Sequence, residues 1–418
     1  MSGPALAGQW GALQPWVAAA LGGDVVDVVR LSAGNSRTSW KVGARGADGI
    51  VRRYVVRHEP GSGPLSGTPL NLGREQVVYA ALADRGVAVP RLRAVRPGGD
   101  ALITDFAAGD DRWEPRLLEP YLRELGALHA VPVDDLALPG FARSSRADLE
   151  LWWEVHDRKA ATVSPLVEIA HRVLLDCHPG EIEPVLCHGD AGPANFLHDG
   201  ERVTALLDWE FSHLGDPHDD LAWISVRAWM FGVDLPDFAE RVRGGYRPPA
   251  GTALDSARFA YWQAVVLLRN LIVVLSAIEN GEPGRTRFVH LSLRPTLEWV
   301  LAAKVAEVAG FAPPAPPPAP ADGPARPGGH LLDEITAGLA ELLPAVAADP
   351  DATRRVRLMR RLAGQLAATW NVRVPPPPGE YADATAEQRL RELAAVAAAE
   401  LSVLPRSARM AATALPTL

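Results

Sequence analysis

The feature that most constrains this chain is a pair of short apolar runs, each of which ends in polar residues. The runs and the residues that follow them are Val185–Cys187 with His188, Asp190 and Asn195, and Ala205–Leu207 with Asp208. Short apolar runs of this kind indicate buried strands, which place the polar side chains at their ends. One carboxylate can then accept a proton from an attacking hydroxyl, while an amide oxygen and a second carboxylate hold Mg²⁺ on a triphosphate. The pattern favours phosphoryl transfer.

The spacing between Asp190 and Asn195 matches the catalytic loop of protein kinases, with Gly189 where those enzymes have arginine. The pattern H-G-D-x4-N, followed by D-W-E at Asp208–Glu210, resembles the aminoglycoside phosphotransferase and choline kinase family. This resemblance implies that Asp190 is the catalytic base and that Asn195 and Asp208 bind Mg²⁺. His188, the other residue assigned to catalysis, is expected to brace the loop by hydrogen bonding rather than to transfer protons.

A downstream segment, Gly215–Ala222, matches the family signature G-D-P-x-x-D-L-A. We expect Asp220 to cap a helix that begins at Leu221 and to support the catalytic loop through hydrogen bonds.

The nucleotide-covering loop of the family corresponds here to a segment between two predicted strands. Its candidate phosphate-binding residues are Gly34, Ser36 and Thr38, which offer backbone N–H groups and hydroxyls. The family often has Ser-Asn where this chain has Ser36-Arg37. A plain hairpin turn is the alternative interpretation of this segment.

A kinase also needs a cation on the nucleotide phosphates, and none of the three lysines of this chain fits that place. Arg57 occupies it, and a subset of the family that resembles acyl-CoA dehydrogenase-linked phosphotransferases has an arginine there before a proline, here Pro60. Arginine stays charged and binds phosphate bidentately. Glu75 is its expected partner, the alternative being an ordinary surface pair.

The periodicity predicts a small lobe of strands followed by a mostly helical region. Strands are expected over Val25–Leu31, Trp40–Val42, Val51–Arg57, Val87–Val89 and Ala101–Phe106. Helices are expected over Asn71–Asp84, Glu119–Ala130, Leu221–Phe231, Ser256–Glu279 and Val289–Val308. The fold class is therefore α+β, a two-lobed protein kinase-like fold with a C-terminal all-α extension.

Four segments follow from this pattern. Residues 1–108 form the nucleotide-binding N-lobe, 109–311 the helical C-lobe with the catalytic loop, 312–329 a proline-rich linker, and 330–418 a helical domain of unknown role. In the last segment, Thr385 and Gln388 have the spacing of a capping box.

Composition narrows the class of protein. The net charge of −8 argues against a nucleic-acid or anionic-membrane partner. Two cysteines are too few for a disulfide scaffold. The most apolar run, Trp262–Ile278, is interrupted by Arg269 and is expected to be a core helix rather than a membrane span. We therefore expect a cytoplasmic protein.

The function predicted from these features is a small-molecule O-phosphotransferase, a Mg²⁺-dependent kinase that transfers the γ-phosphate of ATP or GTP to a hydroxyl. The variant with Arg57 and Pro60 resembles enzymes that phosphorylate hydroxyacyl groups, and this resemblance implies a hydroxyacyl-type acceptor. An aminoglycoside acceptor is the alternative, for which carboxylates are available at Asp110, Asp111, Glu114 and Glu119.

Two further alternatives come from other classes of protein. The first is a nucleotide-binding pseudokinase whose C-terminal helical domain contacts a protein partner or a second copy. The second is a hydrolase with a metal site drawn from His188, Asp190, His198, Asp208, His213 and His218.

Overall fold

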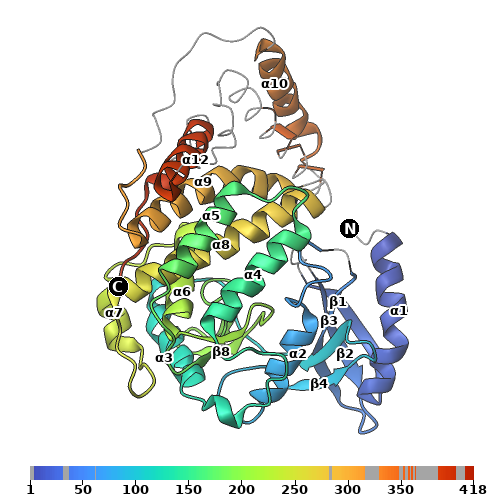
Figure 1. Ribbon diagram of the computed structural model, residues 1–418. Coiled ribbons are helices and arrows are strands. Elements are labelled where there is room, and N and C mark those ends of the chain that lie inside the picture. The colour runs from blue at the N-terminus through green and yellow to red at the C-terminus, as the bar shows by residue number, and fades with distance from the viewer. Residues whose placement is uncertain are drawn as a thin grey trace. The chain divides into compact units, whose positions relative to one another are not determined.

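The computed structural model divides into two compact units, which we call the sheet unit and the helical unit (Figure 1). The described residues are 4–31, 37–61, 63–281, 285–315, 329–347, 352–353, 356–357, 359–360, 363, 385–401 and 410–418. The sheet unit comprises Ser2–Lys159, His178–Val266 and Leu415–Leu418, and the helical unit comprises Ala160–Cys177 and Leu267–Ala414. All the candidate site residues lie in the sheet unit.

The sheet unit begins with helix α1 (Pro4–Leu21), which lies beside the first strands (Figure 1). The strands form a five-stranded antiparallel sheet of order β1-β2-β3-β5-β4. The strands are β1 (Asp24–Arg30), β2 (Thr38–Arg45), β3 (Val51–His58), β4 (Leu92–Val95) and β5 (Ala101–Asp105). A core of Leu13 and Val17 from α1 with Trp40, Val42 and Val56 from the sheet joins the helix to the strands. Helix α2 (Leu72–Ala81) contacts β4 and β5, and Asn71 caps its N-terminus.

The strand expected over Val87–Val89 is wrong, because the fourth strand of this sheet is β4. The Ala88 N–H donates to the Glu124 carboxylate at 2.5 Å, and its carbonyl accepts from Leu206 N at 2.7 Å. The segment is therefore bonded to groups outside the five-stranded sheet, and its apolar residues do not extend that sheet.

The rest of the sheet unit is helical apart from two small antiparallel pairs, β6 with β9 and β7 with β8. These strands are β6 (Val185–Cys187), β7 (Phe196–His198), β8 (Val203–Leu206) and β9 (His213–Gly215). The helices are η1 (Pro115–Leu117), α3 (Leu118–His129), η2 (Val133–Asp135), α4 (Ser145–Lys159), α6 (Pro217–Phe231), α7 (Phe238–Gly245) and the first part of α8 (Ser256–Asn280). Both apolar runs of the catalytic motif are thus short strands, as predicted.

Helix α6 begins four residues earlier than the sequence pattern predicts. Asp216 is its N-cap and accepts a hydrogen bond from His218 N at 2.9 Å, and Pro217 takes the first helical position, which its fixed φ favours. The prediction that Asp220 caps this helix is wrong. Asp220 lies in the first turn, and its carboxylate points to the catalytic loop instead.

The helical unit contains α5 (Pro165–Asp176), α9 (Arg285–Val308), α10 (Gly329–Ala345) and α12 (Ala386–Leu401). Helix α12 packs against α9 and α5, and Arg294 of α9 pairs with Glu400 of α12 at 2.6 Å. The predicted capping box is confirmed, because Thr385 N donates to Gln388 Oε1 at 2.9 Å and Gln388 N to Thr385 Oγ1 at 3.3 Å. Most of the proline-rich segment lies outside the described residues.

One helix of the described chain, α8, is long and apolar enough to cross a membrane. Of its most apolar window, 78% is buried within the protein, and Arg269 in its middle is 1% exposed. A single helix of this kind is weak evidence for a span, since core helices have the same composition.

Candidate active site

The hairpin of β7 and β8 brings the two predicted metal ligands together. Phe196 pairs with Leu206 in the register of the hairpin, and Leu207 N donates to Asn195 O at 2.9 Å. Asn195 directly precedes β7, and Asp208 follows β8 by two residues. Asn195 and Asp208 are 13 residues apart in sequence. They lie close together because one precedes β7 and the other follows β8, and the two strands are antiparallel.

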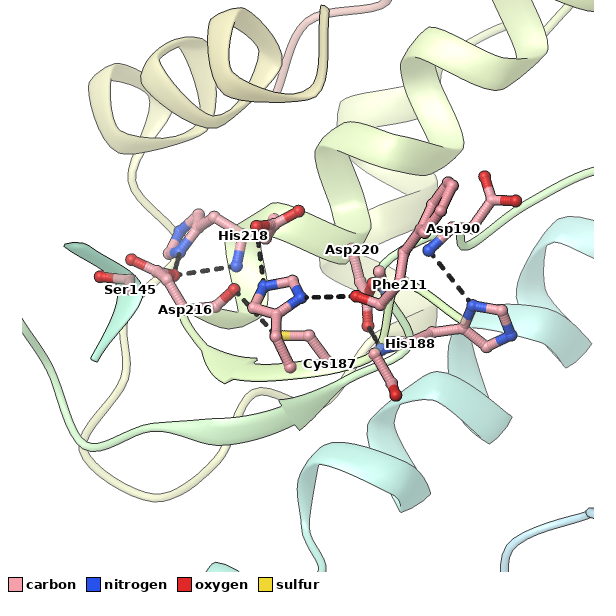
Figure 2. Close-up of polar contacts among 12 residues, drawn as sticks. Ser145, Cys187, His188, Asp190, Phe211, Asp216, His218 and Asp220 are labelled. Atoms are coloured by element: carbon pink, nitrogen blue, oxygen red, sulfur yellow. Dashed lines mark hydrogen bonds and ion pairs between the residues drawn. The ribbon is translucent and has the colours of Figure 1, made fainter. Parts of the chain in front are cut away.

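The catalytic loop after β6 is held by the carboxylate of Asp220. One oxygen accepts a hydrogen bond from His188 N at 2.7 Å (Figure 2), and the other accepts from Gly189 N at 2.9 Å. His129 Nε2 lies 2.9 Å from the same carboxylate. Burial opposes ionisation of this carboxyl, but the hydrogen bond and charge of His129 outweigh it and lower the Asp220 pKa. The loop therefore rests on a fixed negative charge, as its predicted supporting role requires.

His188 braces the loop through both ring nitrogens. Its Nδ1 accepts from Asp190 N at 3.3 Å, so Nε2 bears the proton that it donates to Leu207 O at 2.9 Å. The ring packs on Trp209 with centroids 4.5 Å apart, and burial lowers the His188 pKa. Figure 2 shows the Asp190 carboxylate pointing away from the imidazole. This neutral ring links the two catalytic segments and is not placed to exchange protons with Asp190.

Asp190 is buried, being 8% exposed, and is held by two neighbours. Asn195 Nδ2 donates to the Asp190 carboxylate at 2.5 Å and to its backbone oxygen at 2.9 Å. Arg227 of α6 forms an ion pair with the other carboxylate oxygen and donates to Pro193 O at 2.7 Å. Burial raises the Asp190 pKa to about 6, against the opposing effect of Arg227. A carboxylate with this pKa suits proton acceptance near neutral pH.

Sequence reasoning missed Arg227. The chain does contain a signal for it, since Arg227 lies seven residues after Asp220 on α6. Two helical turns separate them, so both side chains project from one face of the helix towards the catalytic loop.

A cluster of two arginines and three carboxyl groups lies next to the loop. Arg57 on β3 contacts Glu75 on α2 at 2.8 Å, which is the predicted pair, and also Asp208 at 2.9 Å. Arg37 contacts Glu210 at 2.8 Å. Glu75 is fully buried, which excludes the ordinary surface pair that was the alternative. Arg37 and Glu210 were not predicted as members of this cluster.

Asp208 has the properties of a metal ligand. Burial opposes its ionisation, but Arg57 and Arg37 outweigh burial and lower the Asp208 pKa to about 2, so its carboxylate is charged at neutral pH. Its side chain is still 35% exposed, and its backbone has φ of 69°. A non-glycine residue in this left-handed region is strained, which is common where a side chain must be aimed at a functional site.

The donor set fits a hard cation. Because Asn195 Nδ2 makes both of its hydrogen bonds to Asp190, its amide oxygen is the atom with lone pairs for a cation. An amide oxygen and an ionised carboxylate are ligands that Mg²⁺ prefers.

The predicted nucleotide loop is described only at its end. Gly34 and Ser36 lie outside the described residues. Thr38 is the first residue of β2, and its hydroxyl donates to Gln9 Oε1 of α1 at 3.4 Å.

The histidines of the alternative hydrolase site are engaged elsewhere. His198 Nε2 contacts Arg112 O at 2.7 Å, and His213 Nε2 contacts Asp219 at 3.0 Å. His218 Nδ1 contacts Asp216 at 2.7 Å, as Figure 2 shows. Each imidazole thus supports local structure. These three histidines do not converge on one metal site, as the hydrolase alternative requires.

One group of potential ligands does converge, namely His129, Cys187 and Asp220. Both ring nitrogens of His129 have partners, Tyr246 Oη at 2.6 Å and Asp220 at 2.9 Å. These contacts make the group part of the support beneath the catalytic loop.

Comparison with solved structures supports the fold. Choline kinase LicA from Streptococcus pneumoniae matches 73% of this chain and 100% of its own length, with a TM-score of 0.52 and 16% sequence identity. The two-lobed protein kinase-like α+β fold predicted from the sequence is thereby confirmed.

Relatives by sequence agree with the predicted subset. The chain is 29% identical over 191 residues to acyl-CoA dehydrogenase family member 11 of Gallus gallus and 28% identical over 200 residues to member 10 of Mus musculus. These alignments cover 41% and 43% of this chain but only 24% and 19% of the relatives, so the chain corresponds to a minor part of each. The family model described as the phosphotransferase enzyme family, APH, matches residues 27–260, which include every predicted catalytic and metal-binding residue. The chain therefore belongs to the phosphotransferase enzyme family.

Proposed function

We propose that the protein transfers the γ-phosphate of a nucleoside triphosphate to a hydroxyl group of a small molecule. The observation that supports this most directly is the environment of Asp190, a buried carboxylate with a pKa of about 6 that is bonded to Asn195. The acceptor oxygen forms a bond to the γ-phosphorus while its proton passes to the Asp190 carboxylate. The bond from the γ-phosphorus to the bridging oxygen breaks, and the nucleoside diphosphate leaves.

Asn195 and Asp208 are the residues that would hold Mg²⁺, which neutralises charge on the phosphates when it is bound. Arg57 stays charged and is held between Glu75 and Asp208, at 2.8 and 2.9 Å. These two contacts hold the guanidinium beside Asp208, and the family resemblance implies a phosphate-binding cation at this strand position. We assign Arg57 to the nucleotide phosphates on this basis.

The acceptor is proposed to be a hydroxyacyl-type metabolite rather than an aminoglycoside. An aminoglycoside is a polycation, and it requires several carboxylates that are not already neutralised. Of the four candidates, three are paired within the chain: Asp110 with Arg112 at 2.5 Å, Glu114 with Arg116 at 2.7 Å, and Glu119 with Arg241 at 2.6 Å. The likeness to the two acyl-CoA dehydrogenase family members supports the hydroxyacyl class.

Calorimetric titration of ATP and GTP, with and without Mg²⁺, tests the proposal on the parent protein and on Asp208→Ala. We expect Mg²⁺-dependent binding in the parent and its loss in the variant, because Asp208 supplies the charged metal ligand. Absence of nucleotide binding by folded parent protein would exclude the kinase. Binding of nucleotide with no transfer to any hydroxyl acceptor would instead favour the pseudokinase.

The pH dependence of turnover provides a second prediction. Asp190 acts as a base only when it is deprotonated, so kcat/KM should increase about tenfold per pH unit below pH 6 and level off above pH 7. Arg227 lowers the Asp190 pKa, so Arg227→Met should move this limb to higher pH. Arg202→Met, at an exposed arginine, is the control and should leave the profile unchanged. A profile that stays in place in Arg227→Met would contradict the assignment of Asp190 as the titrating base.

A further inference from the structure

Arg37 is a buried arginine that immediately precedes β2, and its side chain belongs to the cluster of carboxyl groups. The residue is 5% exposed, and its Nη1 lies 2.8 Å from Glu210 Oε2, 3.6 Å from Asp208 and 3.7 Å from Glu75. One nitrogen of the guanidinium therefore makes all of its ion-pair contacts with the cluster. Glu210 is the closest of these partners and fixes the position of the group.

The opposite edge of the same guanidinium consists of Nε and Nη2. Neither Nε nor Nη2 of Arg37 has a hydrogen-bond partner among the residues that the structure describes, although both atoms are buried. Burying an N–H donor without a partner costs about 1–3 kcal/mol, and more for a charged group. An arginine edge left in this state beside a candidate active site indicates a ligand that supplies the missing acceptors.

This chain shows elsewhere what that edge binds. Nε and Nη2 of Arg93 both donate to Asp105 at 2.7 Å, and Nε and Nη2 of Arg241 donate to Glu119 at 2.6 and 2.7 Å. In each pair two parallel N–H groups meet two oxygens of one anion. Carboxylate and phosphate groups match this fork geometry equally well. The Nε/Nη2 edge of Arg37 has the same two parallel donors to offer an oxyanion.

The surroundings of Arg37 indicate which oxyanion binds there. The cluster of Arg37, Arg57, Glu75, Asp208 and Glu210 has three carboxyl groups and two guanidinium groups, so it offers no net positive charge to a free anion. An isolated anion is therefore disfavoured there, whereas an anion that arrives with a divalent cation is favoured, because the cation reverses the sign of the local charge. A magnesium-bound polyphosphate has this property.

We propose that Arg37 binds phosphate oxygens of the Mg²⁺-nucleotide through its Nε/Nη2 edge, as a second phosphate-binding arginine beside Arg57. This inference rests on the proposed function and extends it to a residue at which the chain departs from the family pattern. Two arginines, Arg57 on β3 and Arg37 immediately before the adjacent strand β2, then take the place of the single strand lysine. Glu210 acts as the positioning residue that holds Arg37 by its Nη1.

The test is calorimetric titration of ADP in the presence of Mg²⁺ into the parent, Arg37→Gln and Arg37→Lys. We expect Arg37→Gln to weaken binding at least tenfold. Arg37→Lys should recover only part of this loss, because an ammonium group does not offer two parallel donors. Arg93→Gln is the matched control, since it removes an arginine whose Nε/Nη2 edge is already paired with Asp105, and it should bind as the parent does.

Two further arms locate the effect on the phosphates. Arg37→Gln should bind magnesium pyrophosphate more weakly than the parent does, by a similar factor. It should bind adenosine as tightly as the parent does. Loss of adenosine binding to the same degree would show that the variant disturbs the whole pocket, and it would overturn the proposal.

A variant that lacks Arg37 leaves Glu210 without its ion-pair partner, and this alone can destabilise the fold. The double variant Arg37→Gln/Glu210→Gln removes both members of the pair and is the control for that effect. If this double variant or Arg37→Gln binds Mg²⁺-ADP as tightly as the parent, the role of Arg37 is wrong and the proposed kinase stands. If the parent itself binds no nucleotide, both proposals are wrong.

Discussion

Replacement of Asp190 by asparagine is expected to lower kcat by about 10²–10⁴-fold, the range typical of a lost general base. Asparagine has nearly the same shape, but its single amide oxygen can accept from Arg227 or from Asn195 and not from both, and its amide does not accept the proton of the attacking hydroxyl. The affinity for Mg²⁺-nucleotide should change much less than kcat, because Asn195 keeps its hydrogen bond to the Asp190 backbone oxygen and Asp208 keeps its contact with Arg57. The rate of nucleoside diphosphate release in the presence of a hydroxyl acceptor measures kcat. Calorimetry measures the affinity for Mg²⁺-nucleotide separately.

Asp199→Asn serves as the control for this substitution. Asp199 lies in the turn between β7 and β8, where it accepts from Glu201 N and Arg202 N at 3.0 Å, and an asparagine oxygen can accept both bonds. We expect this variant to turn over as the parent does. Equal turnover of Asp190→Asn and Asp199→Asn would show that another group accepts the proton.

The parts of the site that could be predicted are those in which function depends on short sequence spacing. His188, Asp190 and Asn195 are contiguous enough that one loop holds them all. Asp208 joins them because a single hairpin returns the chain to the same place, with Leu207 N bonded to Asn195 O. The pairing of Arg57 with Glu75 was also predictable, because the strand and the helix follow each other along the chain.

The parts that could not be predicted depend on contacts between distant segments. Arg227 reaches Asp190 across 37 residues and Arg37 reaches Glu210 across 173, by their numbering, and no local pattern encodes such contacts. Val87–Val89 has the apolar character of a strand, but its hydrogen-bonding groups at Ala88 are used by Glu124 and Leu206. In each case the tertiary partner decides the outcome.

The start of α6 shows a different kind of error. Aspartate at either 216 or 220 is a plausible cap, since both precede helical sequence. The choice is made by Pro217, which is favoured in the first turn and lacks the N–H that a later position would need. Asp220 is then released from capping, and its carboxylate is available for the backbone N–H groups of His188 and Gly189.

Replacement of Gly189 by alanine is expected to abolish turnover and to lower the unfolding temperature markedly. Gly189 has φ of 77°, a conformation that costs an L-residue about 1–2 kcal/mol. In addition, an added Cβ would lie 2.0 Å from the carbonyl oxygen of Phe211, a backbone atom that cannot rotate away as a flexible side chain does. The catalytic loop must therefore separate from the segment that leads into β9, and this movement displaces His188 and Asp190 on either side.

Gly140→Ala isolates the two contributions to this effect. Gly140 has φ of 81°, and a Cβ there meets nothing within 4 Å, so its substitution imposes the conformational strain without the clash. Thermal unfolding followed by circular dichroism should show a clearly larger decrease for Gly189→Ala than for Gly140→Ala, and only the former should lose activity. Equal decreases would mean that the loop accommodates a side chain at 189. In that case glycine would occupy this place in the motif for its backbone conformation alone, and the close approach to Phe211 would not be what excludes the arginine found there in protein kinases.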